Sequence, residues 1–170
     1  MNCHCDKFLK NEFLAWSIFG ALGRSNTYSS SASERDKKCF HDTLRKKLSE
    51  MVKEYDNPVP EEKHLSNISE LADEMTRSFS HCLRNKRFRI GIAQKSLNLY
   101  LKYLWRSGAI PMPPHCPFDN RIIKKLPECA GLKWTSIDTI EDYHRLVEAA
   151  KKEANGKPLS EWELEIWNQA

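Results

Sequence analysis

Apolar residues recur at helical spacing along almost the whole chain, and this pattern restricts the fold more than any other feature. One example lies between residues 40 and 55, where apolar side chains follow at steps of three and four: Phe40, Leu44, Leu48, Met51, Val52 and Tyr55. Such spacing places them on one face of a helix. No window of five residues alternates clearly between apolar and polar types, so the sequence predicts few or no strands. We therefore expect an all-α fold, a compact irregular bundle of about seven helices.

Capping residues, glycine and proline mark the ends of the expected helices. Three pairs resemble a capping box, in which a hydroxyl precedes an acidic side chain by three positions: Ser33 with Asp36, Thr139 with Asp142, and Ser160 with Glu163. Glycine is expected to break the first helix at Gly20 and to end a later one at Gly108. Helices are thus predicted within residues 8–19, 34–56, 61–84, 94–106, 121–126, 139–155 and 160–168. With 170 residues, 40% of them apolar, the chain can bury a core as a single domain.

Positive charge is concentrated in one segment. The chain has 27 basic and 23 acidic residues, a net charge of +4. No acidic residue lies between Glu74 and Asp119, whereas eight basic residues do: Arg77, Arg84, Lys86, Arg87, Arg89, Lys95, Lys102 and Arg106. Without these eight, 19 basic residues stand against 23 acidic ones, a balance of −4. A local excess is typical of surfaces that bind polyanions, because each neutralised phosphate releases counterions.

The chain contains no sign of a membrane span or of a metal centre. No run of 18 apolar residues is present, and the N-terminus has no signal-peptide pattern. We therefore expect a cytoplasmic protein, with its six cysteines as free thiols. The cluster Cys3, His4 and Cys5 has no second pair at the spacing of zinc ligands. No metal and no cofactor are predicted.

Residues 84–98 predict a site for a nucleic-acid backbone. A tight turn at Gly91 between two helices would expose the first amide groups of the second helix, which favour a phosphate together with the helix dipole. This geometry binds a backbone without reading its sequence. The residues expected to contact phosphate are Arg84, Lys86, Arg87, Arg89, Gly91, Ala93, Gln94 and Ser96.

The same segment resembles a known family. Gly91-Ile92-Ala93-Gln94-Lys95-Ser96 is similar to the hairpin of the helix-hairpin-helix DNA glycosylase superfamily, although Ala93 stands where a second glycine is usual. Pro117-Phe118-Asp119, followed by Asn120 to Lys124, resembles the Pro-x-Asp element of that superfamily. The resemblance covers residues 87–126. It implies one helical domain over 1–170, with a helix-hairpin-helix element at about 66–106, a catalytic loop and short helix at about 107–127, and C-terminal helices over 139–168.

Family membership would imply excision of a modified or damaged base that is flipped out of double-stranded DNA. Asp119 would stabilise the positive charge that develops on the sugar. Lys95 would be the amine nucleophile, with possible strand cleavage, or a phosphate ligand. Tyr100, Trp105 or Trp134 would stack the base. The enzyme would bind DNA mainly through phosphates as a monomer, and would serve either DNA repair or defence against foreign DNA.

Simpler interpretations of the same residues remain open. Asp119 before a short helix is a good N-cap in any protein, and Lys95 in a first helical turn is often a solvated cation. Two other kinds of function fit the charge pattern as well. One is a non-catalytic helical module that binds nucleic acid, and the other is a protein-interaction domain whose basic segment meets an acidic partner.

Overall fold

The computed structural model describes the backbone of residues 3–169 and the side chains of residues 7–169. Within this range all regular structure is helical, apart from one isolated bridge between Tyr28 and Leu83. The described chain contains seven α-helices, which confirms the all-α prediction and the expected number. They are α1 (Cys3–Leu22), α2 (Glu34–Met51), α3 (Glu61–Phe79), α4 (Ile90–Arg106), α5 (Asn120–Ile123), α6 (Ile140–Ala154) and α7 (Leu159–Asn168).

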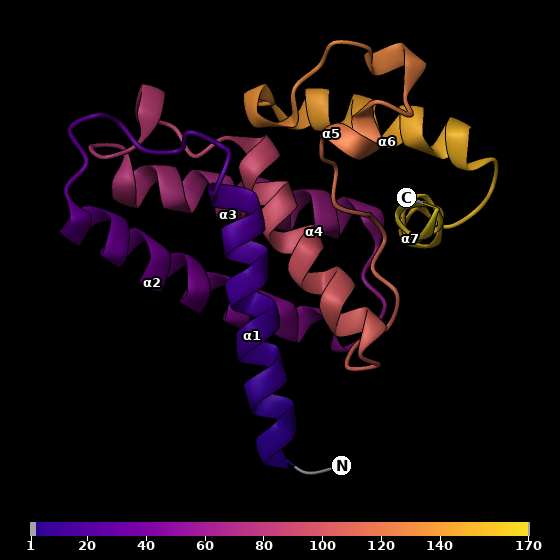
Figure 1. Cartoon of the computed structure of the whole chain (residues 1–170), viewed down its shortest axis with the longest axis horizontal. Coiled ribbons are helices and arrows are strands. Elements are labelled where there is room, and N and C mark those ends of the chain that lie inside the picture. The colour runs from indigo at the N-terminus through magenta and orange to yellow at the C-terminus, as the bar shows by residue number, and fades with distance from the viewer. Residues whose placement is uncertain (1–2, 170) are drawn as a thin grey trace.

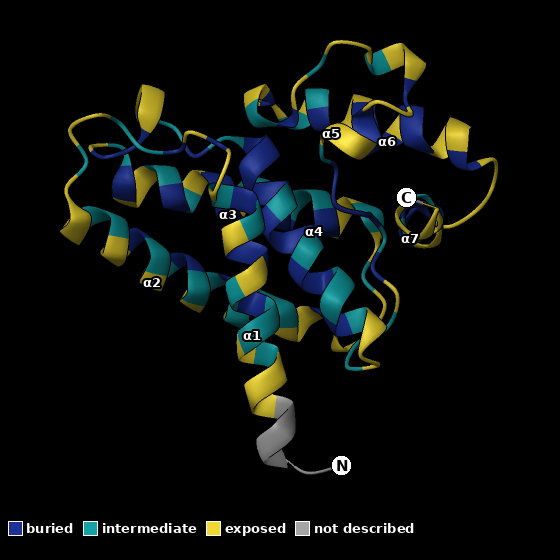
Figure 2. Ribbon diagram, in the orientation of Figure 1, coloured by how far each residue is buried: buried dark blue, intermediate teal, exposed yellow. Residues whose placement is uncertain are grey.

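Helix α4 lies in the middle of the molecule, and the other elements are arranged around it (Figure 1). It packs against α1, α3 and α6, and most of its length is buried (Figure 2). Two of its three charged side chains, Lys95 and Lys102, are seven residues apart, so they point to the same side of the helix. The acid-free segment of the sequence therefore contains the central core helix rather than a surface element.

Helix α1 continues through Gly20, so the break predicted there is wrong. A Cβ atom at Gly20 would lie 2.9 Å from Cδ2 of Leu99 on α4. Glycine at this position lets two helices approach each other closely, and it does not end the helix. The N-terminal half of α1 extends beyond the other helices (Figure 1).

The connection between α3 and α4 also differs from the prediction. Helix α3 ends at Phe79 rather than near residue 84, and α4 already begins at Ile90. The intervening chain leaves the helix because its backbone pairs with residues 27–29: Arg84 N–H donates to Thr27 O at 2.8 Å, and Cys82 O accepts from Ser29 N–H at 2.9 Å. The two helices are thus joined by residues 80–89 and not by a tight turn at Gly91.

The capping predictions succeed at two of three places. Ser33 and Asp36 form a capping box at α2, and the Thr139 hydroxyl accepts from Asp142 N–H at the start of α6. The third pair does not cap α7, which begins after Pro158. Instead the Ser160 hydroxyl lies 2.9 Å from Pro113 O and 3.1 Å from His115 O. This side chain fastens α7 to residues 111–117, the proline-rich loop that precedes Asp119.

No helix of the described chain is long and apolar enough to cross a membrane. Among the cysteines whose side chains are described, Cys39, Cys82, Cys116 and Cys129 are free thiols. Cys3, His4 and Cys5 have side chains outside the described residues.

Candidate functional site

Lys95 and Asp119, the two residues predicted to act in catalysis, form an ion pair. Lys95 lies in the second turn of α4, and Asp119 precedes α5. The Lys95 ammonium donates to Oδ2 of Asp119 at 3.1 Å. The two side chains are 12% and 16% exposed, so the pair is shielded from water but remains accessible. Twenty-four residues of sequence thus separate two groups that meet in space.

Asp119 is an N-cap and an ion-pair partner at the same time. Its Oδ1 accepts from the backbone N–H groups of Arg121 at 2.9 Å and Ile122 at 3.3 Å. Because Oδ2 accepts from Lys95, one carboxylate oxygen forms the ion pair and the other caps the helix. The capping interpretation and the site interpretation are therefore compatible, and capping fixes the orientation of the carboxylate.

Two amide side chains of α4 position the loop that carries Asp119. Gln94 pairs with the backbone of Phe118 in both directions, donating to its carbonyl at 2.7 Å and accepting from its N–H at 3.2 Å. One turn later, Asn98 donates to Cys116 O at 3.0 Å. These bonds fasten residues 116–118 along α4 and leave Asp119 beside Lys95. Both amides are fully buried, so their loss would leave unsatisfied backbone groups.

The residues expected to form a phosphate-binding hairpin are turned into the core. Gly91, Ala93, Gln94 and Ser96 are all buried. The Gly91 N–H donates to Ile137 O at 2.9 Å, and the Ser96 hydroxyl to Ile92 O at 2.9 Å. None of these residues therefore presents its side chain to a phosphate. The Gly91 amide already donates to Ile137 O.

The four basic residues before α4 divide into two pairs. Arg87 bonds Asp73 at 2.7 Å and Asp138 at 3.0 Å. Arg89 donates to the backbone carbonyl of Ser25 at 2.7 Å, so it fastens the segment that follows α1. By contrast, the other pair is exposed and has no carboxylate partner among the described side chains: Arg84 and Lys86.

Of the three aromatic side chains predicted to stack a base, only Trp134 lies beside the ion pair. The Lys95 ammonium is 4.7 Å from the centroid of its ring, within the range of a cation–π contact. Trp134 is itself 5% exposed. Tyr100 points to another hollow, lined also by Lys7 and Asp56. Trp105 lies near the end of α4 against Arg106.

A pocket of about 320 Å³ opens beside Lys95 and Asp119. It lies between α1, α4, the proline-rich loop and α7. Its volume is within the range of pockets that bind small molecules, about 300–1,000 Å³. The lining residues are Gly20, Lys95, Leu99, Lys102, Tyr103, Pro117, Asp119, Glu163 and Trp167.

A second lysine–carboxylate pair, which was not predicted, lines the same pocket. The Lys102 ammonium lies 2.8 Å from Glu163. Burial raises the pKa of the Glu163 carboxyl above its usual value, although the hydrogen bond from Lys102 opposes that shift. The helical spacing of Lys95 and Lys102 was available from the sequence. The position of Glu163 on α7 was not, because it depends on how α7 docks.

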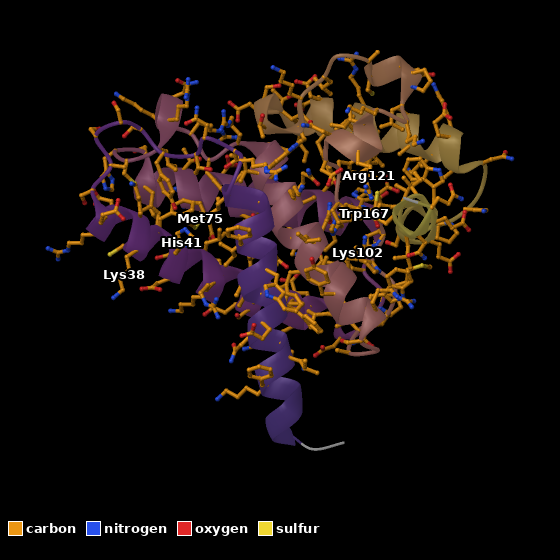
Figure 3. The ribbon with its side chains drawn as sticks, viewed as in Figure 1. Lys38, His41, Met75, Lys102, Arg121 and Trp167 are labelled. Carbon is orange, nitrogen blue, oxygen red and sulfur yellow. The ribbon has the colours of Figure 1, made fainter. Side chains whose placement is uncertain are left out.

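Trp167 forms the outer wall of the pocket between two cations (Figure 3). Its ring lies 4.1 Å from the Arg121 guanidinium and 5.2 Å from the Lys102 ammonium. The indole is 42% exposed, which leaves apolar ring surface open to solvent. An aromatic ring held by cations at the rim of a pocket is suited to stack against a flat ligand.

Exposed basic residues surround α5, close to the pocket. None of them has a carboxylate partner within the described part of the chain: Arg121, Lys124, Lys125 and Lys133. Three of them also line a hollow of about 530 Å³ together with Ile166 and Gln169: Arg121, Lys124 and Lys125. We call Arg121, Lys124, Lys125 and Lys133 the α5 basic patch. In the sequence the acid-free segment ends at Asp119 and these residues follow it directly, so the patch was not predicted.

Comparisons of the chain with protein-family models, with curated proteins and with solved structures find no match.

Proposed function

We propose that the protein is a DNA N-glycosylase whose reacting groups are Lys95 and Asp119. The observation that supports this most directly is the 3.1 Å ion pair of the two side chains at the wall of a pocket. An amine can serve as nucleophile and a carboxylate can stabilise the sugar cation when a glycosidic bond is cleaved, and this pocket offers both groups. The pocket would hold a base flipped out of the duplex, with Trp167 against its ring.

The proposed reaction has a balanced first step. Lys95 passes one proton to Asp119 and attacks C1′ of the deoxyribose as a neutral amine, so the Nζ–C1′ bond forms. The bond from C1′ to the base nitrogen breaks, and its electron pair leaves with the base, which takes up a proton. Asp119 returns its proton to the leaving base, and the carboxylate so regenerated stabilises positive charge on the sugar as that bond lengthens. In a variant of this reaction without lyase chemistry, Asp119 activates water and Lys95 binds phosphate.

Excision measured on duplexes that carry damaged or naturally hypermodified bases tests this proposal. We expect abasic product from the wild type, and a rate at least about 100-fold lower for Asp119→Asn. Asparagine keeps the N-cap of α5, so the variant should fold. Lys95→Gln should abolish a covalent complex trapped by borohydride. Lys47→Gln is the matched control, because Lys47 is another half-buried lysine paired with a carboxylate, at 2.6 Å from Glu74.

Absence of abasic product from the whole panel of duplexes would refute the enzymatic proposal. The α5 basic patch favours a second candidate, a non-catalytic module that binds nucleic acid. That module would bind DNA equally well after Asp119→Asn and release no base. An acidic protein partner, the third possibility, would show itself by a lack of DNA binding at moderate salt.

The α5 basic patch is expected to supply phosphate contacts in either DNA-binding case. Replacing both Lys124 and Lys125 by glutamine should weaken binding to any duplex sequence. The slope of log K against log salt should become shallower by about 1.8 for two lost phosphate contacts. Fluorescence anisotropy at several salt concentrations measures that slope. Lys46→Gln on α2, where Lys46 is 76% exposed, should leave the slope unchanged, and an unchanged slope for the double variant would place the DNA elsewhere.

A further inference from the structure

A second cluster of polar side chains lies apart from the Lys95 pocket, where the first turn of α3 meets α6. The ligand atoms of Glu61, His144 and Glu148 all lie within 4.8 Å of one another. His144 and Glu148 are four residues apart on α6, so one helix face presents both. Their Nε2 and Oε1 atoms are 3.8 Å apart. The mixture of imidazole and carboxylate is a common ligand set for zinc.

The Nε2 atom of a buried histidine faces this cluster without a hydrogen-bond partner. The side chain of His115 is 0% exposed, and its Nε2 lies 3.7 Å from Oε1 of Glu61, which is too long for a hydrogen bond. No other group satisfies that nitrogen. On the other side of the ring, Nδ1 lies 2.8 Å from the Tyr143 hydroxyl. A metal-binding histidine is commonly held through its second nitrogen in this way.

The spacing of these atoms is compatible with one shared ion. Two ligand atoms at 2.0–2.1 Å from a tetrahedral zinc are separated by about 3.3 Å. The 3.8 Å separation of His144 and Glu148 is close to this value, and the ligand atoms of Glu61, His144 and Glu148 lie within 4.8 Å of one another, so small side-chain movements suffice for these three. His115 lies beside Glu61 at 3.7 Å and has to move toward the other two ligands to complete the site. His115 belongs to the proline-rich loop, and the ion would therefore join three parts of the fold.

Lys151 stands between the two carboxylates. Its ammonium lies 2.8 Å from Glu61 and 2.8 Å from Glu148. The Lys151 side chain is 42% exposed and can turn into solvent. The two carboxylates that hold this ammonium would also attract a divalent cation to the same position.

We propose that Glu61, His144 and Glu148 bind a divalent transition-metal ion of the zinc type, which displaces the Lys151 ammonium, and that His115 moves in as the fourth ligand, so that the ion links α3, the proline-rich loop and α6. Sequence spacing did not indicate this site, because its four ligands come from three separate segments. The site is independent of the proposed glycosylase chemistry.

Titration of the full chain with Zn²⁺ by calorimetry tests the proposal. The wild type should bind one equivalent more than His144→Ala or Glu148→Gln, whose replaced side chains are half exposed and should not affect folding. Zn²⁺ held by Cys3, His4 and Cys5 is common to all these proteins and cancels in the comparison. His81→Ala, which removes an exposed histidine 3.4 Å from Asp36, should bind as the wild type does.

A lysine variant separates a metal site from a plain ion-pair network. Lys151→Met removes the competing ammonium, so it should bind Zn²⁺ more tightly than the wild type. Zn²⁺ should also raise the Tm of the wild type and of Lys151→Met, but not that of His144→Ala. Equal stoichiometry in the wild type and His144→Ala, or no gain in affinity for Lys151→Met, would overturn the proposal.

Discussion

Gly91→Ala is expected to destabilise the protein by more than about 3 kcal/mol. Gly91 lies in the first turn of α4, and a Cβ atom there would lie 1.7 Å from the carbonyl oxygen of Trp134. That atom belongs to the backbone, so no side-chain rotation can relieve the contact. The Gly91 amide would also be pushed away from Ile137 O, its acceptor at 2.9 Å. Chemical denaturation followed by circular dichroism measures the loss.

Gly20→Ala is the matched control for this experiment. Gly20 is also inside a helix, but its added Cβ would approach only Cδ2 of Leu99 at 2.9 Å, the end of a flexible side chain. Alanine is favoured over glycine in a helix by about 1 kcal/mol, which offsets part of the strain. We therefore expect a much smaller change than at Gly91. Similar free energies of unfolding for the two variants would mean that the segment at Trp134 does not pack on α4 as described.

Alkaline pH is expected to unfold the protein near pH 11. Burial raises the pKa values of the Tyr55 and Tyr143 hydroxyls and of the Cys116 thiol well above their usual values. The folded state therefore retains these protons at a pH where the unfolded chain has released them. Their stabilising effect is complete below about pH 8.5–10 and is lost as the pH rises further.

The expected size of this loss is comparable with the whole stability of a small domain. Each group lowers the free energy of unfolding by about 1.4 kcal/mol for every pH unit between its unfolded pKa and its higher folded pKa. At pH 11 the three groups together cost on the order of 5 kcal/mol, against a typical total of about 5–15 kcal/mol. A pH titration that follows helical circular dichroism and tyrosinate absorbance together measures the effect. Full ionisation of all five tyrosines while the helices persist would contradict it.

The acid-free segment shows how folding can change the meaning of a charge pattern. Three of its basic residues meet carboxylates that come from outside the segment: Arg87, Lys95 and Lys102. The Arg89 guanidinium donates hydrogen bonds to the backbone carbonyls of Ser25 and Asn26. The segment is thus partly neutralised in the folded protein. The unpaired positive charge near the pocket lies instead in the α5 basic patch. In the sequence its four residues stand close to Asp119 and Glu128, so they do not form a long stretch without acidic residues.

The two glycines inside helices explain why some helix boundaries were wrong. From sequence, Gly20 and Gly91 both indicate a break or a turn, because glycine destabilises helices and permits unusual backbone angles. Both are helical in the structure, at places where another segment comes too close for a Cβ atom. The identity of that neighbouring segment is a property of the packing and has no local signal.

The sequence by itself determined what depends on neighbours a few residues away. Helical periodicity predicted the all-α fold, the capping pairs at Ser33 and Thr139 predicted two helix starts, and the spacing of Asp119 before α5 predicted its N-cap. Hydrogen bonds and apolar stripes of this kind form within one or two turns, so the order of residues suffices to recognise them.

Only the tertiary structure decided which distant residues meet. The bonds from Gln94 and Asn98 to residues 116–118 place Asp119 beside Lys95, and the docking of α7 adds Glu163 and Trp167 to the pocket. Such contacts arise because buried polar groups require partners wherever the packing of the core brings them. Their partners lie tens of residues away, and no local pattern specifies them.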